Sequence, residues 1–140
     1  MILLDTNVIS EPARAGADPN VRQWFDDQEP RDLFLCSPVL AELHYGVERL
    51  PQGARRKRLA EWVRRIEEEE FADRILSFDR NAAREFARVA VVRTRLGGSN
   101  GVMDALIAAI ALAHGAMLAT RNLDDFAGLG LKIINPFELA

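Results

Sequence analysis

The alternation of short apolar runs with longer helical segments constrains the fold of this chain more than any other feature of its sequence. The opening run Met1-Ile2-Leu3-Leu4 ends abruptly at Asp5, and similar runs recur along the chain. We expect strands at residues 1–4, 33–36, 74–78, 117–120 and 131–134. Strands buried on both faces have continuous apolar sequences, and helices between them provide the crossovers of a parallel sheet. The pattern therefore predicts a three-layer α/β/α fold, in which helices flank a short, mainly parallel sheet.

Helix signals fill the segments between these runs. We expect helices at residues 20–27, 37–50, 53–70, 81–96 and 103–114, and a helical turn at 122–126. Ser10 and Ser37 each stand just before a proline-containing first turn, so we expect both to be N-caps. Gly115 is expected to end the long apolar helix. The glycine-rich segment at 97–101 is expected to be a loop.

Length and cysteine content indicate one domain in a reducing compartment. A chain of 140 residues suits a single domain, which we place at residues 1–140. Cys36 is the one cysteine, so an internal disulfide is excluded, and two histidines argue against a His-rich zinc site. The first residues have neither a basic leader nor a long apolar run, and the apolar stretch at 105–112 is too short to span a bilayer. We expect a cytoplasmic protein with no membrane contact.

The charge balance limits how the chain can bind nucleic acid. Its formal net charge is −3, whereas a protein that coats nucleic acid is usually basic. This argues against a general DNA-coating protein. It leaves room for an enzyme that binds a few phosphates through a local basic patch and a metal ion.

Acidic residues recur where strands of the predicted sheet end. Asp5 follows the first strand, Glu42 lies on the helix after the second, Asp104 opens the apolar helix, and Asp124 and Asp125 follow the strand at 117–120. Ligands of open parallel sheets bind beyond the carboxyl ends of the strands. Clustered carboxylates repel one another and recruit hard divalent cations such as Mg²⁺ or Mn²⁺, which can activate water for attack at phosphorus.

Each main candidate also has a structural interpretation. Asp5 could cap the turn after the first strand, Asp104 could interact favourably with a helix N-terminus, and Glu42 could be an ordinary solvated glutamate. We favour a functional role for Asp5, because a carboxylate directly after four apolar residues is costly unless it is partnered. The same holds for Asp104, since its helix is apolar on all sides. From the residues alone, Glu42 stays open.

Weaker candidates lie beside these residues. Thr6 could orient Asp5 or contact a metal-bound water, although hydroxyls in such positions often only satisfy backbone groups. Asn122 could be an N-cap and Asp125 could cap back to it, which makes a structural role the better interpretation of Asp125 alone. Asp124 is a further candidate. Arg121 could neutralise the cluster or bind a phosphate of the substrate.

Four motifs carry a resemblance to a known family. They are Met1-Ile2-Leu3-Leu4-Asp5-Thr6-Asn7-Val8-Ile9-Ser10-Glu11, Ser37-Pro38-Val39-Leu40-Ala41-Glu42-Leu43-His44-Tyr45-Gly46, Asp104-Ala105-Leu106-Ile107-Ala108-Ala109 and Leu118-Ala119-Thr120-Arg121-Asn122-Leu123-Asp124-Asp125-Phe126. Together, and in this order, they resemble PIN-domain ribonucleases, the VapC-type toxins of type II toxin–antitoxin systems, and especially the FitB-like branch.

The resemblance implies a metal-dependent endoribonuclease that uses Mg²⁺ or Mn²⁺ and is inhibited by a small VapB-like antitoxin. Asp5, Glu42 and Asp104 match the acidic metal ligands of the family. Many relatives have a fourth acidic residue where this chain has Asn122, so the role of Asn122 and the number of metal ions stay open. The resemblance also implies RNA as the substrate, a homodimer or a toxin–antitoxin hetero-oligomer, and contact with DNA only through the antitoxin. Two alternatives remain: another metal-dependent phosphoesterase, and a degenerate PIN domain that binds a partner without catalysis.

Overall fold

The computed structural model describes residues 1–97 and 101–138, and within them five strands form one parallel sheet. The strands are β1 (Ile2–Leu4), β2 (Leu33–Cys36), β3 (Ile75–Leu76), β4 (Met117–Ala119) and β5 (Ile133–Ile134). They lie in the order β3-β2-β1-β4-β5, and every neighbouring pair is parallel. The predicted α/β fold is confirmed; β2 has the expected bounds, and the other four strands are one to three residues shorter than expected.

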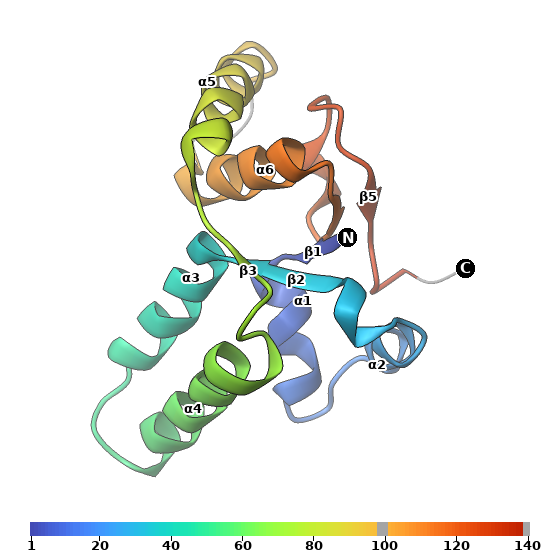
Figure 1. Cartoon of the computed structure of the whole chain (residues 1–140). Helices are drawn as coiled ribbons and strands as arrows, with labels where there is room; N and C mark the ends of the chain where they lie inside the picture. Colours follow the sequence, from blue (N-terminus) through green and yellow to red (C-terminus); the bar gives the residue numbers. More distant parts are fainter. Residues whose placement is uncertain (98–100, 139–140) are drawn as a thin grey trace.

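The helices divide into two groups on opposite sides of the sheet (Figure 1). One side carries α1 (Thr6–Ser10), α2 (Pro19–Asp26), α3 (Ser37–Glu48) and α4 (Ala54–Arg65), and the other carries α5 (Arg80–Arg95) and α6 (Val102–His114). Short helical turns complete the order: η1 (Glu11–Ala13), η2 (Pro30–Asp32), η3 (Ile66–Glu70) and η4 (Leu123–Phe126).

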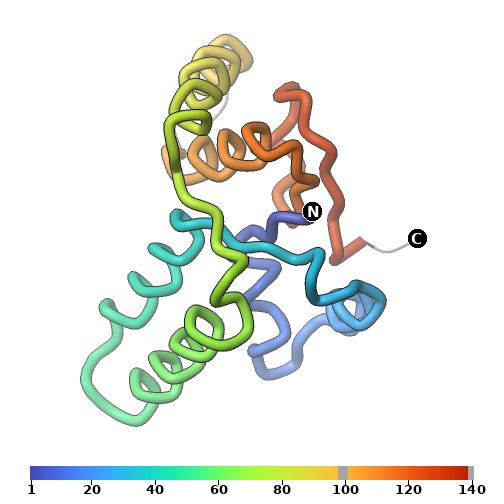
Figure 2. The backbone as a smooth tube through the Cα atoms, viewed as in Figure 1, coloured from blue at the N-terminus to red at the C-terminus, as the bar shows by residue number. Residues whose placement is uncertain are grey.

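The path of the chain explains this division. From β1 through β2 to β3 the chain moves in one direction across the sheet, and it then crosses back to β4 on the other side of β1 (Figure 2). Crossovers between parallel strands are almost always right-handed, so a reversal of direction places the next helices on the opposite face. The reversal leaves β1 and β4 side by side at the centre of the sheet.

The core lies between the sheet and these helices. Leu3, Leu4 and Leu118 of the central strands are fully buried. Helix α6 is buried along most of its length, as its apolar sequence predicts. It ends at Gly115, which adopts the left-handed conformation expected of a C-terminal glycine, with φ 62°. The part of the chain that the structure describes contains no helix long and apolar enough to cross a membrane.

Of the two predicted serine N-caps, Ser10 holds the N-cap position of η1, with Pro12 in its first turn, whereas Ser37 is not an N-cap. Helix α1 begins at Thr6, directly after β1, and Asp5 caps it. Ser10 ends that helix in the helical conformation, and among the described residues its side chain makes no capping bond. Ser37 is already inside α3, and its hydroxyl oxygen accepts a hydrogen bond from the backbone N–H of Phe78 at 3.3 Å.

The helix predicted at residues 53–70 is not regular throughout. It is α-helical over Ala54–Arg65 and becomes the π-helical turn η3, in which the N–H of Phe71 donates to the carbonyl oxygen of Ile66 at 2.9 Å. The wider turn brings these two side chains to the same side, where both are buried. Of the loop expected at 97–101, residues 98–100 lie outside the described residues.

Candidate active site

The central strands β1 and β4 deliver two polar residues to the same edge of the sheet. Asp5 follows β1 and Thr120 follows β4, at the point where the order of the strands reverses. Reversal points of open parallel sheets are the usual place of ligand binding, because the connections on the two sides diverge there. The Thr120 hydroxyl donates a hydrogen bond of 2.8 Å to Asp5 Oδ2 across this point.

Asp5 is a buried carboxylate that is also an N-cap. Its Oδ1 accepts a hydrogen bond of 2.8 Å from the backbone N–H of Thr6, which starts α1. Its exposed fraction is 5%. Burial raises the pKa of Asp5 and outweighs the bonds from Thr120 and Thr6, and the charges of Glu42 and Asp125 raise it further. The capping interpretation is therefore correct but incomplete, since a cap does not require burial among like charges.

Glu42 is joined to Asp5 through Thr6. The Thr6 hydroxyl donates a hydrogen bond of 2.7 Å to Glu42 Oε1, which links α1 to α3. The hydroxyl of Thr6 thus orients Glu42, whereas its backbone N–H orients Asp5. Glu42 is half-buried and its charge acts on Asp5, so it is not an ordinary solvated glutamate.

Asp104 reaches the site from the other layer of helices. It lies in the first turn of α6, and 28% of its side chain is exposed. Its pKa is raised by burial and by the charges of Asp5 and Asp125, and it is lowered by Arg93. Interaction with the helix N-terminus alone does not explain a carboxylate that is disfavoured in its charged form.

The fourth motif contributes one residue to this group and leaves others at the surface. Asp125 is half-buried and acts electrostatically on both Asp5 and Asp104. Asn122 and Asp124 are exposed and line a surface pocket with Arg121. Asn122 holds the expected N-cap position of η4, but its side chain makes no capping bond within the described part of the chain. Its backbone N–H instead donates to the Thr120 hydroxyl oxygen at 3.1 Å.

Arg121 has a local partner. Its guanidinium carbon lies 4.5 Å from the centre of the Phe137 ring, the geometry of a cation–π contact. This contact holds the side chain against the C-terminal segment. Phosphate binding by Arg121 stays a prediction.

Three residues beside the carboxylates are not among those expected from the sequence. Thr120 fixes Asp5, Arg93 approaches Asp104, and Cys36 lies at the end of β2. Burial, with Asp5 and Glu42 nearby, raises the pKa of the Cys36 thiol to about 12, so it stays protonated at neutral pH. The only feature of the sequence that could have indicated Thr120 is its place at the end of a predicted strand. Nothing in the sequence places Arg93 next to Asp104.

The carboxylates of the site are suitable ligands for a hard cation, but they do not lie close enough together to form a closed metal site. Asp5, Glu42, Asp104 and Asp125 offer carboxylate oxygens, the ligand type that Mg²⁺ and Mn²⁺ prefer. In residues 1–97 and 101–138 no three His, Cys, Asp or Glu side chains are close enough to hold a metal ion. This is compatible with Mg²⁺, which is commonly held by one or two carboxylates, several waters and the phosphates of a substrate.

Comparison with known proteins identifies the family of this site. The PIN domain family matches residues 2–130. The chain is 42% identical over 143 residues to the VapC ribonuclease Y4jK of Sinorhizobium fredii, with all of both chains covered. It is 36% identical to the toxin FitB of Neisseria gonorrhoeae, with 99% of each chain covered. It also resembles the solved structure of FitAB bound to an IR36 DNA fragment, with a TM-score of 0.92, 35% identity and coverage of 100% of this chain and 98% of the other. The chain therefore belongs to the PIN domain family.

Proposed function

We propose that this chain is a divalent-metal-dependent endoribonuclease that acts as the toxin of a toxin–antitoxin pair. The observation that carries the proposal is the group formed by Asp5, Glu42, Asp104 and Asp125 at the reversal point of a PIN-domain sheet. A VapC ribonuclease and a toxin among its full-length relatives support the reaction and the biological role.

Asp5 and Asp104 would hold the principal Mg²⁺ or Mn²⁺ ion, and Glu42 would complete the site. When bound, such an ion lowers the pKa of water and offsets the charge that develops on a phosphate. The protein contributes by holding the carboxylates that would bind the ion in fixed positions. Asp5 is fixed through both oxygens, and Glu42 is fixed through Thr6, so neither carboxylate has to be ordered again when RNA arrives.

Asp125 is the acidic residue of the fourth motif that we assign to the cluster. Its charge acts on Asp5 and Asp104, whereas Asn122 and Asp124 lie at the surface. Asn122 would place an amide where many relatives have a carboxylate. We therefore propose one firmly held ion and a second ion that binds weakly until an RNA phosphate contributes ligands.

The antitoxin would occupy an apolar groove on the opposite side of the sheet from α5 and α6. The groove has a volume of about 920 Å³ and lies between η1, α2 and the α4–η3 segment. Phe25, Trp62 and Ile66 contribute apolar lining, and the exposed Arg22 and Arg65 border it. Asp26 and Glu70 also line the groove, so it suits a segment with apolar side chains flanked by charges of both signs, which we assign to a small VapB-like antitoxin. DNA contact would then belong to the antitoxin, and the pair would act in the cytoplasm.

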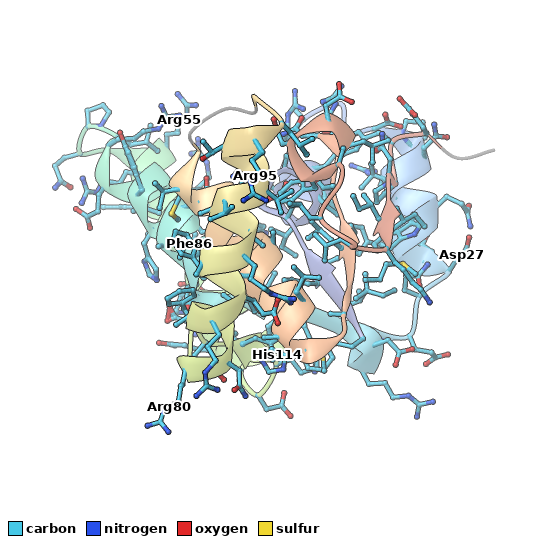
Figure 3. The ribbon with its side chains drawn as sticks, turned by 90° about the horizontal axis from the view of Figure 1, so that it is seen from above. Asp27, Arg55, Arg80, Phe86, Arg95 and His114 are labelled. Carbon is cyan, nitrogen blue, oxygen red and sulfur yellow. The ribbon has the colours of Figure 1, made fainter. Side chains whose placement is uncertain are left out.

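Cleavage of RNA by the purified, antitoxin-free chain tests the proposal. We expect cleavage of RNA with Mg²⁺ or Mn²⁺, none with EDTA, and none by Asp5→Asn or Asp104→Asn. Asp27→Asn is the matched control, because Asp27 is an exposed aspartate on the far side of the molecule from α5 (Figure 3). Hydrolysis of small phosphate esters without RNA cleavage would indicate another phosphoesterase. Absence of both cleavage and Mn²⁺ binding would indicate a degenerate binding module.

A further inference from the structure

Arg93 is a charged side chain buried between α5 and α6. Its exposed fraction is 6%, whereas Arg80 and Arg95, toward the two ends of α5, are exposed (Figure 3). A buried guanidinium is costly unless it is paired and hydrogen-bonded. The burial of Arg93 therefore requires an explanation, whereas the exposed arginines of the same helix require none.

Two contacts of Arg93 lie at the start of α6. Nη1 donates a hydrogen bond of 2.7 Å to the carbonyl oxygen of Gly101, and Nη2 lies 4.0 Å from Asp104 Oδ2. Gly101 is the N-cap of α6, and its carbonyl oxygen also accepts the first helical bond, from Ala105 at 3.2 Å. One guanidinium thus reaches both the residue that starts the helix and the carboxylate within its first turn.

We propose that Arg93 is a positioning residue, whose guanidinium fixes the first turn of α6 so that the Asp104 carboxylate faces the metal site. This inference rests on the proposed function. At 4.0 Å the ion pair is longer than a hydrogen bond, so Asp104 can bind a divalent ion while the bond to Gly101 stays in place. In this role Arg93 acts on the ion through Asp104 and is not itself a ligand.

A positioning role and a purely electrostatic role predict opposite changes. If Arg93 acted only as a positive charge, its removal would make the site more negative and would tighten binding of a divalent cation. If it positions Asp104, its removal weakens binding. Lysine retains the charge but lacks the planar fork that can reach two groups at once. A space of about 140 Å³ beside Arg93 gives a lysine ammonium room to lie away from Asp104.

Calorimetric titration of Mn²⁺ into the wild type, Arg93→Lys and Arg93→Met tests the inference without relying on activity. We expect both variants to bind Mn²⁺ at least about tenfold more weakly, the range found when groups that orient metal ligands are removed. RNA cleavage at saturating Mn²⁺ should show a lower kcat with little change in KM. The control is Arg80→Met, which removes an exposed arginine from the same helix and should bind Mn²⁺ as the wild type does.

The outcomes separate the possibilities. Mn²⁺ binding by folded Arg93→Lys that equals or exceeds that of the wild type overturns the inference, even if its melting temperature is lower. If Arg93→Met does not fold, Arg93→Lys decides. Failure of the wild type itself to bind Mn²⁺ refutes the proposed function and with it the inference, whereas wild-type binding that survives in Arg93→Lys refutes the inference alone.

Discussion

Replacing Asp104 by asparagine should separate the stability of the metal-free protein from its response to metal. The substitution keeps the shape of the side chain and removes its charge. The pKa of Asp104 is raised, so the fold disfavours the charged form at neutral pH despite Arg93. Without metal, Asp104→Asn should therefore be at least as stable as the wild type.

When metal is bound, the wild type should instead be more stable than Asp104→Asn. An ion present at 100 times its Kd stabilises the folded state by about 2.7 kcal/mol. For a chain of this size about 3–4 °C of melting temperature corresponds to each kcal/mol, so the wild type should gain about 8–11 °C. Loss of one of two principal carboxylates should weaken binding by about 100-fold or more, since loss of a group that merely orients a ligand already costs about 10–100-fold. The variant should then gain only about 0.4 kcal/mol, or about 1 °C, at the same Mn²⁺ concentration.

Thermal unfolding in EDTA and in Mn²⁺, followed by circular dichroism, measures both effects. Asp27→Asn, at the exposed C-terminal end of α2, should gain as much from Mn²⁺ as the wild type does. An equal gain in Asp104→Asn and the wild type would refute the role of Asp104 as a ligand. A variant much less stable than the wild type in EDTA would refute the argument from the raised pKa.

Four further predictions concern pH, the fourth motif, the antitoxin and assembly. Because the pKa values of Asp5 and Asp104 are raised, the folded protein binds protons that the unfolded chain has released. The free energy of unfolding of the metal-free wild type should thus fall as pH rises from 3.8, the usual aspartate pKa, through the raised pKa values of the two residues. In the double variant Asp5→Asn with Asp104→Asn, urea unfolding should show a smaller fall over the same pH range. Asn122→Asp should tighten Mn²⁺ binding in calorimetry. Asp125→Ala should mainly lose Mn²⁺ affinity. If Asp125→Ala instead lost about 1 kcal/mol of stability with unchanged Mn²⁺ affinity, Asp125 would be a helix cap and not a ligand. Ala13→Arg, in the groove, should abolish antitoxin binding and retain RNA cleavage, with Ala15→Arg outside the groove as its control. Sedimentation should give the mass of a dimer for the free toxin, and a monomer at high concentration would contradict this prediction.

Local patterns in the sequence carried the prediction of the fold. Strands buried on both faces must be apolar throughout, and so the short runs ending at Leu4 and Cys36 could be recognised without knowledge of their neighbours. The helix that ends at Gly115 could also be predicted locally, because its apolar sequence and its terminal glycine lie within the helix and at its end. Predicted caps failed where the bond depends on distant atoms, as at Ser37, whose hydroxyl accepts from Phe78.

The sequence by itself indicated that carboxylates gather at one edge of the sheet, since the ends of parallel strands meet there, but it left open which of Glu42, Asp124 and Asp125 belong to the group. Only the tertiary structure decided how these carboxylates are held. The hydrogen bond from Thr120 to Asp5 spans 115 positions, and the one from Thr6 to Glu42 spans 36. Whether Arg93 faces solvent or Asp104 depends on how α5 packs against α6, and neither helix alone contains that information. Charge and spacing are properties of the chain, whereas the burial that raises a carboxylate pKa exists only after the layers have packed.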